Sequence, residues 1–258
     1  MKTTFYKYQA TGNDFVMIDN RDRHFPKGDA DRIAGLCHRR FGIGADGLIL
    51  LEEDPEADFR MVYFNADGHQ GSMCGNGGRC AVAFASFLGL VGEQCRFVAA
   101  DGLHRAKMRG GLISLEMAEV REIHTTPRYS FLNTGSPHHV QQVEDLDELD
   151  VFSEGKRIRY GLYGQEGSNI NFVAPKGSDR LRVRTYERGV ENETYSCGTG
   201  VTASALALYA AGILTRPVVQ VETLGGELEV RFEQTPSGEY ADIWLTGPAE
   251  LVFKGEWL

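Results

Sequence analysis

One sequence pattern occurs twice in this chain at a fixed spacing. The segments Cys74–Gly77 and Cys197–Gly200 both read Cys-Gly-x-Gly and lie 123 residues apart. Each is followed by small and apolar residues that are typical of the opening of a helix. Other pairs share the spacing with no insertion between them: Gly12 and Gly135, Asp46 and Asn169, Tyr63 and Tyr186, Asn65 and Arg188, and Gly89 and Gly212. The sequence therefore predicts a duplicated fold with one cysteine at a matched position in each half.

Both halves show the same order of strands and helices. In the first half we expect strands over 4–9, 15–19, 48–52, 58–65, 95–100 and 112–117, and helices over 30–37 and 75–88. In the second half we expect strands over 128–133, 139–143, 169–174, 180–186, 217–223, 227–233 and 240–246, and helices near 145–153 and over 198–212. The long helix of each half is apolar on nearly every side, which is typical of a buried helix.

These features predict an α/β (α+β) fold with two pseudo-symmetric domains. Each domain is expected to be a mixed β-sheet or barrel wrapped around its central helix, and the two would face each other across a cleft. The chain has 258 residues, enough for two domains of about 125 residues each. We expect the linker within 117–128 and therefore predict domains over residues 1–122 and 123–248.

Charge and cysteine content exclude several classes of function. A net charge of −9 argues against binding to a nucleic-acid backbone. The longest largely apolar run, about 203–214, is too short to span a bilayer, and we expect no signal region because the residues before the first strand are not apolar. Five cysteines are an odd number, which favours free thiols in a reducing compartment over a disulfide framework. We expect a cytoplasmic protein that acts on a small molecule, without nucleic-acid or membrane partners.

Each repeated cysteine lies where a helix is expected to begin. There the helix dipole is positive and the first backbone N–H groups lack intrahelical partners. This favours the thiolate and can lower a cysteine pKa from about 8.5 toward neutrality, while the N–H groups can bind a carboxylate. If a pseudo-two-fold axis relates the halves, the two sulfurs lie above and below the carbon beside that carboxylate. We therefore predict that Cys74 and Cys197 invert a carbon centre as acid and base, without a cofactor.

Segments that match one enzyme family occur in order along essentially the whole chain. In the first half they are Gly12-Asn13-Asp14-Phe15, Gly42-Ile43-Gly44-Ala45-Asp46-Gly47, Phe64-Asn65-Ala66-Asp67-Gly68 and Cys74-Gly75-Asn76-Gly77-Gly78-Arg79-Cys80. In the second half they are Pro137-His138, Asn169-Ile170-Asn171-Phe172, Tyr186-Glu187-Arg188-Gly189 and Cys197-Gly198-Thr199-Gly200. With this set the chain resembles the diaminopimelate epimerases, which interconvert LL- and meso-diaminopimelate for lysine and peptidoglycan synthesis.

The resemblance implies an amino-acid epimerase that works through two thiols, with no pyridoxal phosphate, other cofactor or metal. It also implies a homodimer and a last strand, about 249–258, that returns to the first domain. Substrate contacts are implied at Asn13, Asn65, Asn169 and Arg188, the last three at the distal amino and carboxylate groups. Backbone donors to the reacting carboxylate are implied at Gly75, Asn76, Gly198 and Thr199. His138 and Glu187 resemble residues that adjust the cysteines and the reacting amino group, and Glu187 also counts as a substrate contact.

Two positions depart from the family pattern. Many members have Asn before the Pro-His pair, where this chain has Ser136, and some have Gln where it has Gly47. Ser136 can still form a hydrogen bond with the distal end of the substrate, but its reach is shorter. Gly47 supplies no side chain.

Several other interpretations stay open at the level of sequence. Asn65 and Asn169 also fit turn residues, His138 a structural histidine, and Arg188 a surface arginine. The runner-up function is a proline racemase or hydroxyproline epimerase, which shares the paired cysteines but resembles Cys-Gly-His-Gly and lacks the Tyr-Glu-Arg-Gly segment. A thiol redox or metal-binding module is a third possibility, although a lone C-x5-C, Cys74 to Cys80, lacks the spacing of a zinc site.

Overall fold

The chain folds into two compact units. A computed structural model describes residues 2–258. Unit 1 is the chain up to Leu115 together with Gly247–Leu258, and unit 2 is Glu116–Thr246. The sequence placed the boundaries after residues 122 and 248. The first lies earlier because the expected linker packs into unit 2, where Val120 is buried and bonded to the backbone of Tyr240.

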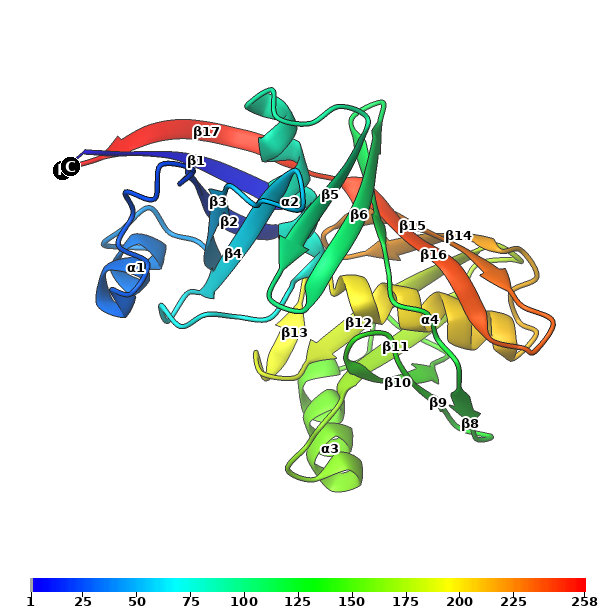
Figure 1. The fold of residues 1–258 in the computed structure, drawn as a ribbon. Helices are drawn as coiled ribbons and strands as arrows, with labels where there is room; N and C mark the ends of the chain where they lie inside the picture. Colours follow the sequence, from blue (N-terminus) through cyan, green and yellow to red (C-terminus); the bar gives the residue numbers. More distant parts are fainter. Residues whose placement is uncertain (1) are drawn as a thin grey trace. The chain divides into compact units, whose positions relative to one another are not determined.

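Unit 1 is a mixed sheet with a helix on each face (Figure 1). Its strands are β1 (Thr3–Ala10), β2 (Asn13–Asp19), β3 (Gly47–Glu52), β4 (Phe59–Asn65), β5 (Gln94–Ala99), β6 (Gly102–Arg109), most of β7 (Leu112–Glu116) and β17 (Glu250–Trp257). Its helices are α1 (Ala30–Cys37) and α2 (Gly75–Phe87). β1 lies antiparallel between β17 and β2, β2 is parallel to β3, and β3 is antiparallel to β4. β4 is then parallel to β5, and antiparallel pairs join β5, β6 and β7.

The apolar runs of β2 and β3 are buried on both faces. Alternate residues such as Phe15 and Ile49 pack with α2, while Val16 and Leu48 pack with α1. Continuous apolar strands of this kind are typical of a sheet covered on both sides. α2 contacts β1 to β4 and β17, so it is the central helix of unit 1.

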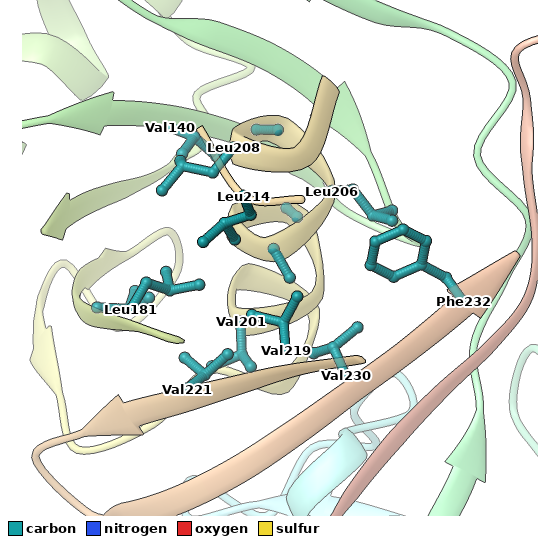
Figure 2. Close-up of a cluster of buried hydrophobic side chains, with 14 of the residues drawn as sticks. Val140, Leu181, Val201, Leu206, Leu208, Leu214, Val219, Val221, Val230 and Phe232 are labelled. Carbon is teal, nitrogen blue, oxygen red and sulfur yellow. The ribbon is translucent and has the colours of Figure 1, made fainter. Parts of the chain in front are cut away.

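Unit 2 repeats this plan around α4 (Gly198–Ala210). Its strands are β8 (Ile123–Thr125), β9 (Ser130–Asn133), β10 (Pro137–Gln142), β11 (Asn169–Pro175), β12 (Arg180–Glu187), β13 (Asn192–Thr194), β14 (Val218–Thr223), β15 (Gly226–Gln234) and most of β16 (Tyr240–Pro248). β10 is parallel to β11, β11 is antiparallel to β12, and β12 is parallel to β14. Figure 2 shows the apolar side chains of α4 and the surrounding strands, such as Val201, Leu206, Val219 and Phe232, packed together. The predicted fold class is confirmed.

Strands β11 and β12 of unit 2 are offset from β3 and β4 of unit 1 by 122 residues, not 123. In unit 1 the sheet pairs Leu48 with Phe64, and in unit 2 it pairs Ile170 with Tyr186. Both unit 2 residues follow their counterparts by 122 positions, whereas the cysteines keep the spacing of 123. The expectation of a repeat without insertions is therefore wrong. One residue is missing before β11 and one is added between β12 and Cys197, where loops absorb the change.

This shift changes which residues are equivalent. If the register is continued by one residue past Phe64 and Tyr186, the unit 2 counterpart of Asn65 is Glu187 and not Arg188. A shift of one residue also reverses the face of a strand. Asn171 is consequently the counterpart of Ile49, and both face the central helix of their unit.

The helix expected near 145–153 begins later, as α3 (Val151–Tyr163). The Asp145 carboxylate accepts bonds from the N–H groups of Asp147 and Glu148 and holds a turn, and Asp150 caps the helix by accepting from Ser153. Aspartate favours such turns and caps over helix interiors. Among the helices of residues 2–258, none is both long and apolar enough to cross a bilayer.

Candidate active site

Cys74 occupies the residue before the first turn of α2. Its backbone is extended, with φ −112° and ψ 124°, and its carbonyl accepts the first helical bond from Gly78 at 2.7 Å. The side chain makes no capping hydrogen bond and is half-buried. A Cβ at Gly77 would lie only 3.1 Å from Ile49 and Met61, so glycine lets this helix start pack closely on the sheet.

Cys197 occupies the same position before α4. Its φ is −117° and its ψ is 107°, and its carbonyl accepts from Val201 at 2.8 Å. Its Sγ lies 3.5 Å from Oγ1 of Thr199. A Cβ at Gly200 would lie 2.3 Å from Oδ1 of Asn171, which makes glycine a requirement here. Both repeated cysteines thus stand at the N-terminus of a central helix.

The other three cysteines lie inside unit 1. Burial raises the pKa of Cys37 to about 11 and of Cys95 to about 12, and it also raises that of Cys80. Raised values keep these thiols protonated and unreactive. In residues 2–258 all five cysteines are free thiols, and no three His, Cys, Asp or Glu side chains are grouped as metal ligands.

Asn13 and Asn76 lie next to Cys74. Oδ1 of Asn13 accepts from the Cys74 thiol at 3.5 Å and from Nδ2 of Asn76 at 3.4 Å. Nδ2 of Asn13 donates to Asp46 at 2.7 Å, and Arg39 bonds the other oxygen of Asp46 at 2.6 Å. Strand β2, the helix start and the turn before β3 therefore bring these predicted residues together, and the Asp46 carboxylate sets the orientation of the Asn13 amide.

Arg188, Asn169 and Ser136 form a second cluster, within unit 2. Nδ2 of Asn169 donates to Oγ of Ser136 at 3.0 Å, and its Oδ1 accepts from the backbone N–H of Arg188 at 2.9 Å. The Arg188 guanidinium donates to the carbonyl of Glu166 at 3.0 Å and reaches Ser136 at 3.5 Å. The adjacent Glu187 accepts from Thr194 at 2.9 Å. An exposed guanidinium beside an amide and a hydroxyl suits a carboxylate ligand.

His138 lies buried in β10, beside the first turn of α4. Its Nδ1 lies 3.1 Å from Nδ2 of Asn171, and its Cε1 lies 3.4 Å from where a Cβ of Gly200 would be. Burial lowers the pKa of His138 to about 3, and the positive charge of Arg188 acts in the same direction. The imidazole is therefore neutral at physiological pH.

Asn65 and Gly47 lie opposite each other where β4 and β3 pair. Asn65 is exposed, and its backbone forms a turn with Gly68 and His69. A Cβ at Gly47 would lie 2.5 Å from the Tyr63 ring and from the carbonyl of Phe64. Tyr63 thus fills the space that a side chain at position 47 would need, which explains the glycine there.

Comparison with known proteins shows to which family the chain that carries these two cysteines belongs. A family model described as diaminopimelate epimerase matches residues 5–124 and 130–252. The diaminopimelate epimerase of Flavobacterium psychrophilum is 55% identical over 251 residues, covering 96% of this chain and 98% of that protein. The chain belongs to the diaminopimelate epimerase family.

Solved structures share the fold of this diaminopimelate epimerase family member at low identity. A PhzF-family phenazine biosynthesis protein of Bacillus anthracis has a TM-score of 0.78 and 14% identity, with 100% of this chain and 99% of that chain covered. A probable proline racemase of Agrobacterium radiobacter has a TM-score of 0.72 and 17% identity, with 99% and 93% covered. These likenesses concern the fold alone.

Arg79 also lies in the site region, although the sequence indicated no role for it. It is fully buried in α2, where it donates to Asn76 at 3.0 Å, to Thr11 at 3.1 Å and to the carbonyl of Pro248 at 3.3 Å. Its Nη1 has no partner among residues 2–258, and burial lowers its pKa. The matched position of α4 is Thr202. An arginine within a run that is otherwise apolar on every side was the signal that could have revealed it.

Replacing Arg79 with methionine is expected to lower the free energy of unfolding by about 3 kcal/mol, because the buried acceptors on Asn76 and Thr11 and the partly buried carbonyl of Pro248 lose their donor. Urea unfolding followed by circular dichroism measures the change. Arg96→Met, at an exposed position of β5, is the matched control and should change stability by less than about 0.5 kcal/mol. Equal stability of the two variants would contradict this role for Arg79.

Proposed function

We propose that this chain is a diaminopimelate epimerase that interconverts LL- and meso-2,6-diaminopimelate in the synthesis of lysine and peptidoglycan precursors. The observation that carries the proposal is the matched pair of cysteines, Cys74 and Cys197, each at the N-terminus of a buried helix. The 55% identity to a curated diaminopimelate epimerase over nearly the full length supports the substrate.

The proposed reaction uses the two thiols as base and acid. The thiolate of one cysteine takes the α-proton, so that the C–H bond breaks, an S–H bond forms and the electron pair moves into the carboxylate as an enediolate. The thiol of the other cysteine then gives its proton to the opposite face of the carbon. Each turnover exchanges the protonation states of Cys74 and Cys197, and no cofactor is required.

The helix starts would stabilise the charge that develops on the carboxylate. In each helix the first intrahelical N–H donor is Gly78 or Val201, so the N–H groups of Gly75 and Asn76, and of Gly198 and Thr199, precede it. Such groups bind anions, and donors that are already oriented lower the barrier for charge formation. We assign these four backbone groups to the reacting carboxylate.

The Arg188 cluster would hold the other end of the substrate. Its guanidinium, with Asn169 and Ser136, offers donors to a distal carboxylate and an acceptor to a distal amino group. We assign Asn65 to the same end, Asn13 to a substrate contact near Cys74, and Glu187 to the reacting amino group. Proline has no distal carboxylate, so this cluster favours diaminopimelate over the proline racemase alternative.

We also propose a cytoplasmic location and a homodimer. The five free cysteines support a reducing compartment. The homodimer rests on the family resemblance. Light scattering after size-exclusion chromatography tests the assembly directly. A measured mass equal to that of one chain would contradict the homodimer.

Incubation with LL-diaminopimelate in D2O tests the function. The expected result is conversion to the meso form with one deuterium at the inverted α-carbon only, because only the carbon between the two thiols loses its proton. NMR and mass spectrometry locate the label. Exchange with proline but not with diaminopimelate would move the chain to the runner-up function, and stoichiometric zinc in protein purified under reducing conditions would favour a metal-binding module.

A further inference from the structure

His138, Asn171 and Thr185 form a buried chain of hydrogen bonds in the sheet of unit 2. None of the three is more than 3% exposed. Nδ2 of Asn171 donates to the backbone carbonyl of His139 at 2.9 Å and faces Nδ1 of His138 at 3.1 Å. The hydroxyl of Thr185 donates to Oδ1 of Asn171 at 3.0 Å. The family resemblance assigns a role to His138 but none to Asn171 or Thr185.

This arrangement determines where the proton of His138 resides. A backbone carbonyl can only accept, so the amide end of Asn171 that contacts it is the NH2 group. The same NH2 group faces Nδ1 of His138, and Nδ1 must then be the acceptor. A neutral imidazole has one N–H, and here it lies on Nε2.

The Nε2–H group is a buried donor beside the helix start that carries Cys197. It has no partner among residues 2–258 and no solvent exposure. A buried donor without a partner is costly, and native proteins keep few of them. The ring lies against Gly200 in the first turn of α4, where an anion would bind.

In the described part of unit 1 the matched positions hold no such chain, so the fold itself does not require it. The counterparts of His138 and Asn171 are Phe15 and Ile49, which lie 3.5 and 3.1 Å from where a Cβ of Gly77 would be. They pack there as apolar core side chains. The polar chain is therefore a property of the Cys197 side alone.

We propose that Asn171 and Thr185 are positioning residues that hold His138 as its Nε2–H tautomer. His138 then serves as a hydrogen-bond donor to the anionic group at the start of α4, and not as a proton acceptor. This proposal rests on the proposed epimerase function for its kinetic consequence, whereas the tautomer itself is a property of the protein without substrate.

The tautomer is tested first, by 15N NMR of the substrate-free protein labelled in histidine. The His138 signals, assigned by their loss in His138→Gln, should show an unprotonated Nδ1 and a protonated Nε2 from about pH 6 to about pH 9. Asn171→Leu should change this protonation pattern. If Asn171→Leu does not fold, Thr185→Val takes its place in the test. A protonated Nδ1 in the unmodified protein, or a pattern that neither variant alters, would overturn the proposal whatever the enzyme's activity.

The kinetic test separates a donor from a base. A glutamine amide can place an N–H where Nε2 lies but cannot accept a proton, so His138→Gln should keep kcat within about tenfold of the unmodified enzyme. His138→Phe, which introduces the residue of unit 1, should lose about a hundredfold. Equal losses in the two variants would show that His138 acts as a base or only as packing.

Asn171→Leu has a matched control in unit 1. Asn20 is also buried, donates to Glu52 at 2.7 Å and accepts from Phe25 at 2.8 Å. Asn171→Leu should lower kcat at least about tenfold, because His138 no longer keeps one tautomer. Asn20→Leu should leave the His138 tautomer and kcat unchanged. If the unmodified protein does not epimerise diaminopimelate, the proposed function fails while the NMR result still decides the tautomer.

Discussion

Replacing either Cys74 or Cys197 with alanine is expected to abolish the interconversion of LL- and meso-diaminopimelate, with kcat at least about a thousandfold lower. Inversion needs a base on one face of the carbon and an acid on the other, so a single thiol cannot complete it. The side chains of both cysteines make no capping bond, and alanine should leave α2 and α4 intact. A coupled assay that detects the meso isomer measures the loss, and circular dichroism checks the fold.

The half-reaction distinguishes the roles of the two thiols. Each alanine variant should still exchange the α-proton of one stereoisomer with D2O, through the cysteine that remains, and the two variants should prefer opposite isomers. Cys95→Ala is the control, because this buried thiol has a pKa raised to about 12 and should not affect catalysis. Near-normal epimerisation by either Cys74→Ala or Cys197→Ala would refute the two-thiol mechanism.

Replacing Arg188 with glutamine is expected to lower kcat/KM for diaminopimelate at least about a hundredfold, mainly through KM. The distal carboxylate of the substrate would lose its charged pair with the guanidinium, an interaction present in both the ground state and the transition state. Steady-state kinetics with LL-diaminopimelate in both variant and parent enzyme measure the effect. The neighbouring Asn169 and Ser136 remain and should preserve part of the binding.

Arg180→Gln is the matched control for Arg188→Gln. Arg180 begins strand β12, which ends at Glu187 just before Arg188, and its exposed ion pair with Glu227 spans 3.5 Å. Exposed pairs of this kind contribute little, so kcat/KM should stay within about twofold of the parent value. A normal kcat/KM in Arg188→Gln would remove the distal-carboxylate role and with it the main argument against a proline substrate.

Much of the fold could be predicted because its signals are local. The strands appear as short apolar runs between turns, and α1, α2 and α4 were expected within two residues of their observed ends. Where local signals were ambiguous the prediction was wrong. Asp145 and Asp150 could each start a helix, and only the structure shows that the first holds a turn and the second caps α3.

The position of Cys74 and Cys197 before the two central helices could be predicted from the sequence, but the residues that surround these helix starts could not. Arg79 lies in a run of residues that is otherwise apolar and therefore predicts a buried helix. Asn171 lies in a buried strand, two residues after Asn169, which by sequence also fits a turn. Both Arg79 and Asn171 lie in segments that match the family, but those segments do not show their contacts, because the partners Thr11, Pro248 and Thr185 come from other strands or segments. Such contacts depend on register and packing, which a single sequence does not display.

The duplication, the family and the position of Cys74 and Cys197 at the starts of two buried helices could all be inferred from the amino-acid sequence. Those properties follow from residues a few positions apart and from repeated motifs. The three-dimensional structure was needed to show that β11 and β12 are offset by 122 residues from β3 and β4, that Arg79 donates to Asn76, and that Asn171 faces His138. Because a shift of one residue in a strand reverses its face, the hydrogen-bonded register, and not the spacing along the chain, determines which side chains lie at each helix start.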